Sequence, residues 1–327
     1  MMNKENMMNN PKNWMVLGAV LAGIGVLICT IAFVVLGFDF KKLSTVKYAS
    51  NTYEVGEAFG NINIVADIEE ISFVPTDDKN CKVICYEEEN EPHHVTVENN
   101  TLMIETIEKN GLQLLNFSIS TATPKITVYL PKNEYELLTI DSDTSDVMIP
   151  ENFSFEGMNI TLDTGDISCL ASANGNISIQ TDTGDITLSG VSANDMHLTS
   201  DTGEMKLSGL TLTETINIKE STGDVNMKNV SCKKFISNGS TGDLTMSNVI
   251  ATEEFSLERN TGDIEFDGCD AETIYIHTDT GHVNGTLLSE KVFLIETDTG
   301  EVDVPKTITG GRCEITTDTG DISIKVQ

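Results

Sequence analysis

The feature that most constrains the fold is a tetrapeptide of the form Asp-Thr-Gly-Asp, which returns every 19 or 20 residues along the C-terminal part of the chain. A fixed period of this length is typical of stacked units, each of which buries its apolar residues only against its neighbours. The repeat therefore predicts a solenoid. Anchored on the threonine, the ten copies lie at Thr144, Thr164, Thr183, Thr202, Thr222, Thr241, Thr261, Thr280, Thr299 and Thr319.

Apolar residues keep fixed distances from this threonine. Three residues after it every copy is apolar, and five residues after it only Gly285 breaks the pattern. Before it, pairs such as Ile177 and Ile179 alternate with polar residues, and a spacing of two is the spacing of a strand. We therefore predict an all-β protein, a parallel β-helix or solenoid of about ten coils over residues 137–327, with strands about 4.8 Å apart.

Two corners of each coil are marked by residues that tolerate a positive φ. The first is the glycine after the threonine, replaced only by Ser145 in the first copy. Glycine and asparagine enter the left-handed region at the lowest cost, so both positions are predicted to be turns. The second corner, seven residues after the threonine, carries Gly190, Gly209, Asn229, Asn248 and Gly268.

The N-terminal segment has a different composition. An uncharged stretch runs from Trp14 to Leu36, long enough to cross an apolar bilayer core of about 30 Å. It is too long for a secretory signal and lacks a cleavage site. We expect a short tail over residues 1–13, a single transmembrane α-helix over residues 14–37 and a stalk over residues 38–58. The flanking lysines leave the orientation open, and we favour a C-terminal body outside the cell membrane because long domains translocate largely regardless of flanking charge.

Residues 59–136 alternate apolar and polar residues without the Asp-Thr-Gly period and are interrupted by prolines. Because a solenoid needs its first edge covered, we predict a β-rich N-terminal cap here, with an independent binding domain as the alternative. At the far end, the strand predicted around Ile322 to Val326 has no capping sequence after it. We expect this edge to be open and to meet a partner or a second copy.

The chain carries a formal net charge of −31, all of it after residue 40. Such a body is repelled by nucleic acid, so we exclude nucleic-acid binding and expect the membrane, through the N-terminal helix, and an unknown protein or glycan as partners. Acidic residues flank each turn in two columns, one residue before and two residues after the threonine. Ca²⁺ could bind between stacked carboxylates.

Turn capping explains the first acidic column better than Ca²⁺ does, because Ser221, Ser240 and Asn260 share only a side-chain oxygen with aspartate. For the second column, broken only by His282, we expect a solubilising role. We accordingly predict no cofactor and no metal site, with Ca²⁺ as the open alternative. Adjacent residues of a strand face opposite ways, so His93 and His94 do not form a ligand pair by themselves.

Enzyme chemistry finds little support in the sequence. Asp-Thr-Gly is also the tripeptide of aspartic proteases, but those enzymes bring two copies face to face, whereas these copies follow one line. A lyase-like, carbohydrate-active β-helix would need a basic catalytic residue, and the array holds only Arg259 and Arg312 as arginines. Arg259 is expected beside Glu220 across the small Gly239, as a stacked surface ion pair. We predict no catalytic residues.

Several stretches resemble the bacterial putative-adhesin, β-strand-repeat family known as domain of unknown function 4097, over roughly residues 55–327. The resemblance rests on the run from Phe59 to Ile64, the run from Lys125 to Lys132 and the repeated Thr-Gly-Asp-Ile. It implies a β-helical, membrane-anchored envelope protein, often associated with envelope-stress responses, and it transfers no catalytic residues. We therefore expect a non-enzymatic cell-envelope scaffold; the alternatives are a lyase-like enzyme and a Ca²⁺-dependent adhesin.

Overall fold

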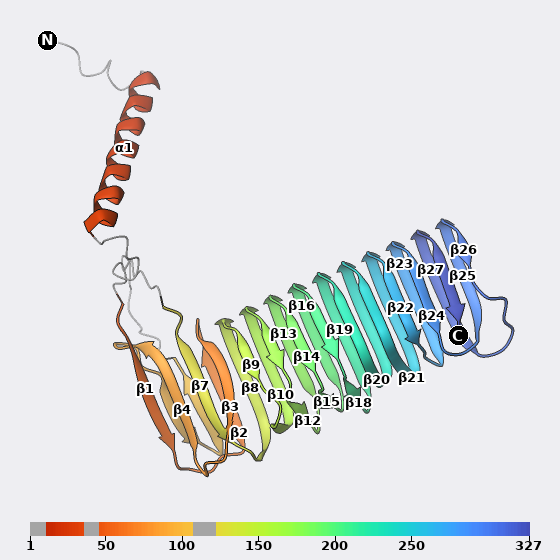
Figure 1. Cartoon of the computed structure of the whole chain (residues 1–327), viewed down its shortest axis with the longest axis horizontal. Coiled ribbons are helices and arrows are strands. Elements are labelled where there is room, and N and C mark those ends of the chain that lie inside the picture. The colour runs from red at the N-terminus through yellow and green to blue at the C-terminus, as the bar shows by residue number, and fades with distance from the viewer. Residues whose placement is uncertain (1–10, 36–45, 107–121) are drawn as a thin grey trace. The chain divides into compact units, whose positions relative to one another are not determined.

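The computed structural model describes residues 11–35, 46–106 and 122–327, and it divides into two units. The first unit contains the helix α1, Pro11–Val35 (Figure 1). Large apolar side chains are exposed along it, among them Met15 at 73% and Val35 at 78%. Among the residues that the structure describes, no helix is both long enough and apolar enough to cross a membrane. A helix is thus present within the predicted segment, but its spanning role is not confirmed.

The second unit is built from strands, the first of which begins at the boundary between the units. Its N-terminal strands are β1 (Tyr48–Val55), β2 (Asn61–Ala66), β3 (Glu70–Thr76), β4 (Cys81–Glu88), β5 (His94–Glu98), β6 (Thr101–Glu105) and β7 (Lys125–Pro131). The strands that follow are β8 (Glu134–Thr144), β9 (Val147–Ile149), β10 (Ser154–Thr164), β11 (Ile167–Cys169), β12 (Ser172–Ala173), β13 (Ile177–Thr183), β14 (Ile186–Ser189), β15 (Ser192–Ala193), β16 (Met196–Thr202), β17 (Met205–Ser208), β18 (Thr211–Leu212), β19 (Thr215–Thr222), β20 (Val225–Thr241), β21 (Leu244–Thr261), β22 (Ile264–Cys269), β23 (Thr273–Thr280), β24 (Val283–Leu287), β25 (Lys291–Thr299), β26 (Val302–Asp303), β27 (Gly311–Thr319) and β28 (Ile322–Val326).

Each coil of the repeat lies in register on its neighbours. Thr164 of β10 pairs with Thr144 on one side and with Thr183 on the other, and every pair in this part of the sheet is parallel. The coils stack side by side along the second unit (Figure 1). The predicted all-β solenoid is confirmed, because the sequence period and the coil period are the same.

The apolar columns form one continuous core inside the coils. Ile186, Leu188 and Val225 are fully buried, as the period predicts. The exception at Gly285 has a packing reason: a Cβ there would lie 2.2 Å from a ring carbon of Phe266 in the coil before it. The large ring fills the space that a side chain at position 285 would otherwise occupy.

The glycine of the first corner is needed for two reasons. Gly184 has a φ of 149°, and a Cβ there would lie 2.0 Å from the carbonyl oxygen of Gly165 in the preceding coil. Any side chain would therefore collide with the neighbouring turn. The second corner is confirmed as a left-handed position, with φ of 69° at Gly190 and 54° at Asn229.

The region predicted as a cap continues the solenoid, but out of chain order. The coil β2–β3 pairs in parallel with β8–β9 on one side and with β6–β7 on the other. Antiparallel strands lie outside these coils, β4 on β7 and β5 on β6. Part of the predicted stalk is also folded, since β1 pairs with β4.

The C-terminal end shows the same exchange of order. The strand β27 lies between β23 and β25, and β28 lies between β24 and β26. The last coil of the chain is therefore inserted before the coil that precedes it in sequence. The predicted open edge at Ile322–Val326 is wrong for Ile322 and Ser323, which pair with β26. Among the described strands, residues 324–326 pair only with β24, and the outermost strands of the described solenoid are β25 and β26.

Candidate functional site

The acidic column two residues after the threonine makes a ladder of hydrogen bonds along the turns. The backbone N–H of Asp185 donates to Oδ1 of Asp166 at 2.9 Å, and the N–H of Asp263 donates to Oδ1 of Asp243 at 2.8 Å. The N–H groups of Gly184 and Ile186, on either side of Asp185 in the chain, donate to backbone carbonyls of the next coil. The N–H of Asp185 instead donates to a side-chain oxygen of the preceding coil. We call this column the turn ladder.

His282 shows what the turn ladder requires. Its backbone N–H donates to Oδ1 of Asp263 at 2.7 Å, and its Nδ1 accepts the N–H of Asp321 at 3.0 Å. An imidazole nitrogen therefore takes the place of a carboxylate oxygen as the acceptor at this position. Turn capping was predicted for the first column, but among the described residues the caps come from the second column, and the first column shows only contacts such as Ser221 Oγ to Asp201 Oδ1 at 3.3 Å. The second column therefore has a structural role beside the solubilising role expected for it.

Inside the turns, an inward column of hydroxyls supports the glycine carbonyls. Thr181 Oγ1 donates to Gly165 O at 3.3 Å, and Thr317 Oγ1 donates to Gly281 O at 3.3 Å. Glu220 occupies the same column, although it carries a carboxylate instead of a hydroxyl.

Glu220 and Arg259 form a buried ion pair within this column. Arg259 Nη2 lies 3.1 Å from Glu220 Oε2, and both side chains have no exposed surface. Gly239 lies between them in register and leaves the necessary space. The predicted stacking is confirmed, but the predicted surface location is wrong. Burial raises the pKa of Glu220 to about 7, although Arg259 acts in the opposite direction.

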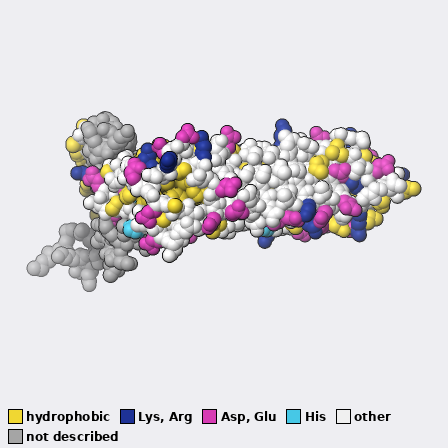
Figure 2. All heavy atoms as spheres, turned by 90° about the horizontal axis from the view of Figure 1, so that it is seen from below, with side chains coloured by type: hydrophobic (Ala, Val, Ile, Leu, Met, Phe, Trp, Pro, Cys, Tyr) yellow, Lys and Arg dark blue, Asp and Glu magenta, His cyan; other side chains and the backbone are white. Residues whose placement is uncertain are grey.

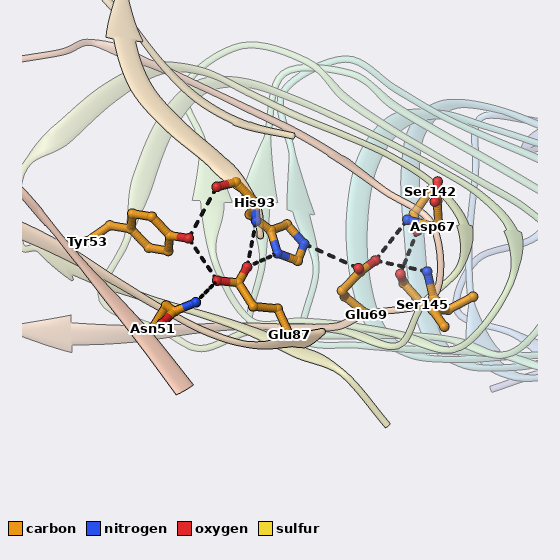
Figure 3. A network of polar contacts seen from close by, with 9 residues as sticks. Asn51, Tyr53, Asp67, Glu69, Glu87, His93, Ser142 and Ser145 are labelled. Atoms are coloured by element: carbon orange, nitrogen blue, oxygen red, sulfur yellow. Dashed lines mark hydrogen bonds and ion pairs between the residues drawn. The ribbon is translucent and has the colours of Figure 1, made fainter. Parts of the chain in front are cut away.

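A second polar network lies among the N-terminal strands, where His93 is held between two carboxylates (Figure 3). Its Nδ1 lies 2.5 Å from Glu87 Oε2, and its Nε2 lies 3.2 Å from Glu69 Oε1. Asn51 Nδ2 and the Tyr53 hydroxyl donate to the other oxygen of Glu87 at 2.5 and 2.8 Å. We call these five residues the His93 network.

Charge is stabilised within the His93 network. Burial alone would lower the pKa of His93, but hydrogen bonds and charges of Glu69 and Glu87 outweigh it and raise the pKa. Burial alone would raise the pKa of Glu87, but hydrogen bonds from the His93 backbone and from Asn51 bring it below the ordinary value. The arrangement therefore favours the protonated form of the imidazole, which lies between two buried carboxylates.

Sequence reasoning missed this network, because its residues come from separate segments. One signal was present: along β4 the inward positions are Cys81, Val83, Cys85 and Glu87, and a carboxylate at an inward position needs a partner.

The other candidates from the sequence lie apart from one another. His277 pairs with Asp279 at 3.2 Å on the surface, and His282 faces Asp321 instead of sharing an ion with Asp279. Arg312 pairs with Glu314 and lies over the ring of Tyr275. The buried Arg259 cannot contact a substrate.

The face shown in Figure 2 carries acidic side chains scattered along the second unit, with hydrophobic side chains gathered near its two ends. At the C-terminal end, the edge coil exposes Leu294 and Val302 at 48% each and Ile308 at 91%. Within the described residues, β25 pairs on one side only, with β27. We call β25, β26 and Ile308 the open end.

The fold and the turn ladder define a parallel β-solenoid with a coil of 19 or 20 residues. The chain belongs to the Toastrack DUF4097 family, which matches residues 59–229 and 211–327. The family resemblance seen in the sequence is thereby confirmed. No curated protein matches the chain.

The chain is similar to solved structures of bacterial proteins at low identity. A "putative adhesin" from Bacteroides fragilis NCTC 9343 is 17% identical, with a TM-score of 0.40, over 86% of this chain and 97% of its own. A "putative lipid binding protein" from Parabacteroides distasonis ATCC 8503 is 15% identical, with a TM-score of 0.46, over 72% of this chain and 96% of its own. A "putative adhesin" from the same organism is 9% identical, with a TM-score of 0.44, over 84% of this chain and 98% of its own. These values transfer no ligand or activity to this chain.

Proposed function

We propose that this protein is a non-enzymatic, single-pass envelope protein whose acidic solenoid stands outside the cell membrane as an adhesin-like scaffold. The rigid stack of coils, held by the turn ladder, suits it to present a surface rather than to enclose a substrate. The burial of Arg259 supports this proposal over a lyase-like enzyme, because the basic residue that such chemistry would use serves the interior.

The anchoring part of the proposal rests on the N-terminal segment. The sequence is uncharged from Trp14 to Leu36, and the apolar side chains described in α1 are exposed to a large extent, for example Val26 at 67%. Apolar side chains on all sides of a helix suit a lipid environment. Membrane extraction that distinguishes carbonate-resistant from carbonate-released protein tests this part.

The observation that carries the binding role is the open end. Phe293 and Ile295 occupy inward columns but are only partly buried, since no described coil covers them. An edge strand with unpaired backbone groups and apolar side chains is a template for strand addition. We propose that a second copy of this chain covers the open end, with the two β25 strands antiparallel about a two-fold axis.

The test is to measure the molecular mass of the full chain in detergent over a series of protein concentrations. We expect a dimer that dissociates in Leu294→Lys, because the charge is placed in the proposed interface. Met148→Lys is the matched control, since Met148 is 58% exposed on β9, far from the open end in sequence and in the stack of coils. A monomer at every concentration, or equal behaviour of the two variants, would contradict self-association through this edge.

A further inference from the structure

Three side chains of the types that bind zinc converge where Cys85 adjoins Glu87 and His93 of the His93 network. One ligand atom each from Cys85, Glu87 and His93 lies within 4.8 Å of the other two, and all three residues are buried. Cys85 and Glu87 share the inward face of β4 because they are two residues apart, and His93 immediately precedes β5. Thiolate, imidazole and carboxylate together suit Zn²⁺ better than Ca²⁺ or Mg²⁺. We propose that Cys85, Glu87 and His93 form a zinc site.

The geometry is close to that of a tetrahedral zinc. Standard bond lengths place a nitrogen and an oxygen ligand about 3.3 Å apart, and a sulfur and a nitrogen ligand about 3.6 Å apart. His93 Nδ1 and Glu87 Oε2 are 2.5 Å apart in a hydrogen bond, so replacing its proton by zinc requires them to separate by less than about 1 Å. Cys85 Sγ lies within 4.8 Å of the other two ligand atoms, so it needs to approach His93 Nδ1 by about 1.2 Å at most.

Outer contacts for two of the three ligands are already in place. With Nδ1 on the metal, His93 Nε2–H points to Glu69 Oε1 at 3.2 Å, the carboxylate–histidine–metal arrangement that fixes the ring and its tautomer. This buried Nε2 has an ion-pair contact there but makes no well-aligned hydrogen bond in the metal-free arrangement. Asn51 and Tyr53 hold Oε1 of Glu87. Its Oε2 accepts the backbone N–H of His93 at 2.6 Å, and the second lone pair of Oε2, which now faces His93 Nδ1, is the one that the metal would take.

Binding balances in protons and charge, although burial and the charges of Glu87 and Glu69 raise the pKa of the Cys85 thiol to about 12, a cost that the zinc–sulfur bond has to offset. Zinc forms bonds to Cys85 Sγ, His93 Nδ1 and Glu87 Oε2, and it displaces the thiol proton and the Nδ1 proton to solvent without any oxidation. Before binding, one imidazolium and the carboxylates of Glu69 and Glu87 sum to one negative charge. After binding, Zn²⁺, one thiolate and the same two carboxylates also sum to one negative charge. The buried site therefore changes neither its net charge nor the number of its carboxylates. A fourth coordination position is left for water.

The metal would fasten parts of the N-terminal region to one another. The ligands join β4 to the segment before β5, and Glu69, whose other oxygen accepts the N–H groups of Asp67 and Ile68, joins the turn between β2 and β3. A zinc ion that binds only the folded chain raises the unfolding temperature by mass action. The inference goes beyond the proposed scaffold role and does not depend on it.

The test uses the full chain in detergent, stripped with a chelator and titrated with Zn²⁺ against a competing fluorescent chelator. We expect one tight equivalent and the release of about two protons per metal near pH 7, as the ligands lose their protons. Titration with Co²⁺ should give a thiolate-to-metal charge-transfer band, which surface carboxylates cannot produce. These readouts on the unaltered protein do not require any variant to fold.

Variants then assign the ligands. Cys85→Ser and His93→Gln should lose the tight equivalent and the cobalt band, and Glu69→Gln should weaken binding about 10–100-fold. Cys81→Ser is the matched control, because Cys81 is also buried on the inward face of β4 but lies outside the cluster. The absence of a cobalt band, no proton release, or equal affinity in Cys85→Ser and Cys81→Ser would overturn the zinc site and leave only loose binding to surface acids.

Discussion

At the scale of single residues, Gly239 is a position where the interior has no space for a side chain. A Cβ there would lie 2.4 Å from Arg259 Nη1 and 2.6 Å from Glu220 Oε2. We expect Gly239→Ala to destabilise the protein by about 1–3 kcal/mol, because the buried pair has no space to move. The double variant Glu220→Thr with Arg259→Thr replaces both charged residues by threonine, the residue found at position 181 of the same column. In that double variant, Gly239→Ala should cost much less.

Denaturant unfolding of the four proteins measures this coupling. The double threonine variant should be close to the parent or more stable, since replacing a buried pair by well-packed residues is often neutral or stabilising. An equal cost of Gly239→Ala in both backgrounds would show that the glycine is needed for its backbone and not for the ion pair.

The buried Glu220 also gives a pH dependence with a definite sign. Burial raises its pKa from 4.5 to about 7, so the folded chain holds a proton that the unfolded chain has released. Stability from this group is full below about pH 4.5 and is lost as the pH rises through about 7, by about 3 kcal/mol at most. In Glu220→Gln the unfolding free energy should fall less between pH 5 and pH 8. Parallel pH profiles of the two proteins would contradict the shift.

At the scale of the turn, the ladder predicts that an acceptor matters more than a charge. Asp243→Ala removes the acceptor for the N–H of Asp263 and should cost about 1 kcal/mol, whereas Asp243→Asn keeps an acceptor and should cost less. Asp163→Ala, in the exposed column before the threonine, is the matched control. Denaturation midpoints of the three variants measure the difference. Equal losses of stability in Asp243→Ala and Asp243→Asn would make the charge itself the stabilising property.

The same contacts bear on cations. Each ladder aspartate that caps a neighbouring turn already uses one oxygen for an N–H, which leaves fewer oxygens for the six to eight ligands that Ca²⁺ needs. We expect thermal unfolding in chelator and in millimolar Ca²⁺ at matched ionic strength to give the same midpoint. Stabilisation by several degrees that is specific to Ca²⁺ would make the acidic columns ligands.

The strands and both corners could be predicted because every coil repeats the same steric demands, such as the glycine at Gly184 and the left-handed asparagine at Asn229. The role of the turn ladder could not, because both acidic columns flank the same turn and only the direction of one N–H decides which is used. The His93 network was also beyond the sequence, because residues as far apart as Asn51 and His93 meet only after the strands pair.

At the scale of the whole solenoid, the exchanged order of coils escaped prediction because the period runs unbroken through Thr280, Thr299 and Thr319. A coil with the right columns fits on either neighbour, so the repeat fixes the register but not the stacking order. The turn ladder follows the spatial order: the N–H of Asp321 donates to His282, and the N–H of Glu301 donates to Asp321. The columns of the repeat therefore do not decide the order of the coils at the end of the stack.

Engineered disulfides test this order directly. Thr316 pairs in register with His277 on one side and with Glu296 on the other, so His277 and Glu296 are separated by an intervening strand. Neighbouring strands lie about 4.8 Å apart, within disulfide reach, whereas strands two steps apart lie about 10 Å from each other, beyond it. We expect His277→Cys with Thr316→Cys to cross-link, and His277→Cys with Glu296→Cys, the matched control, to remain reduced. Peptide mapping by mass spectrometry reads both outcomes. The opposite pattern would mean that the last two coils stack in the order of the chain, and the open end would then belong to β27 and β28.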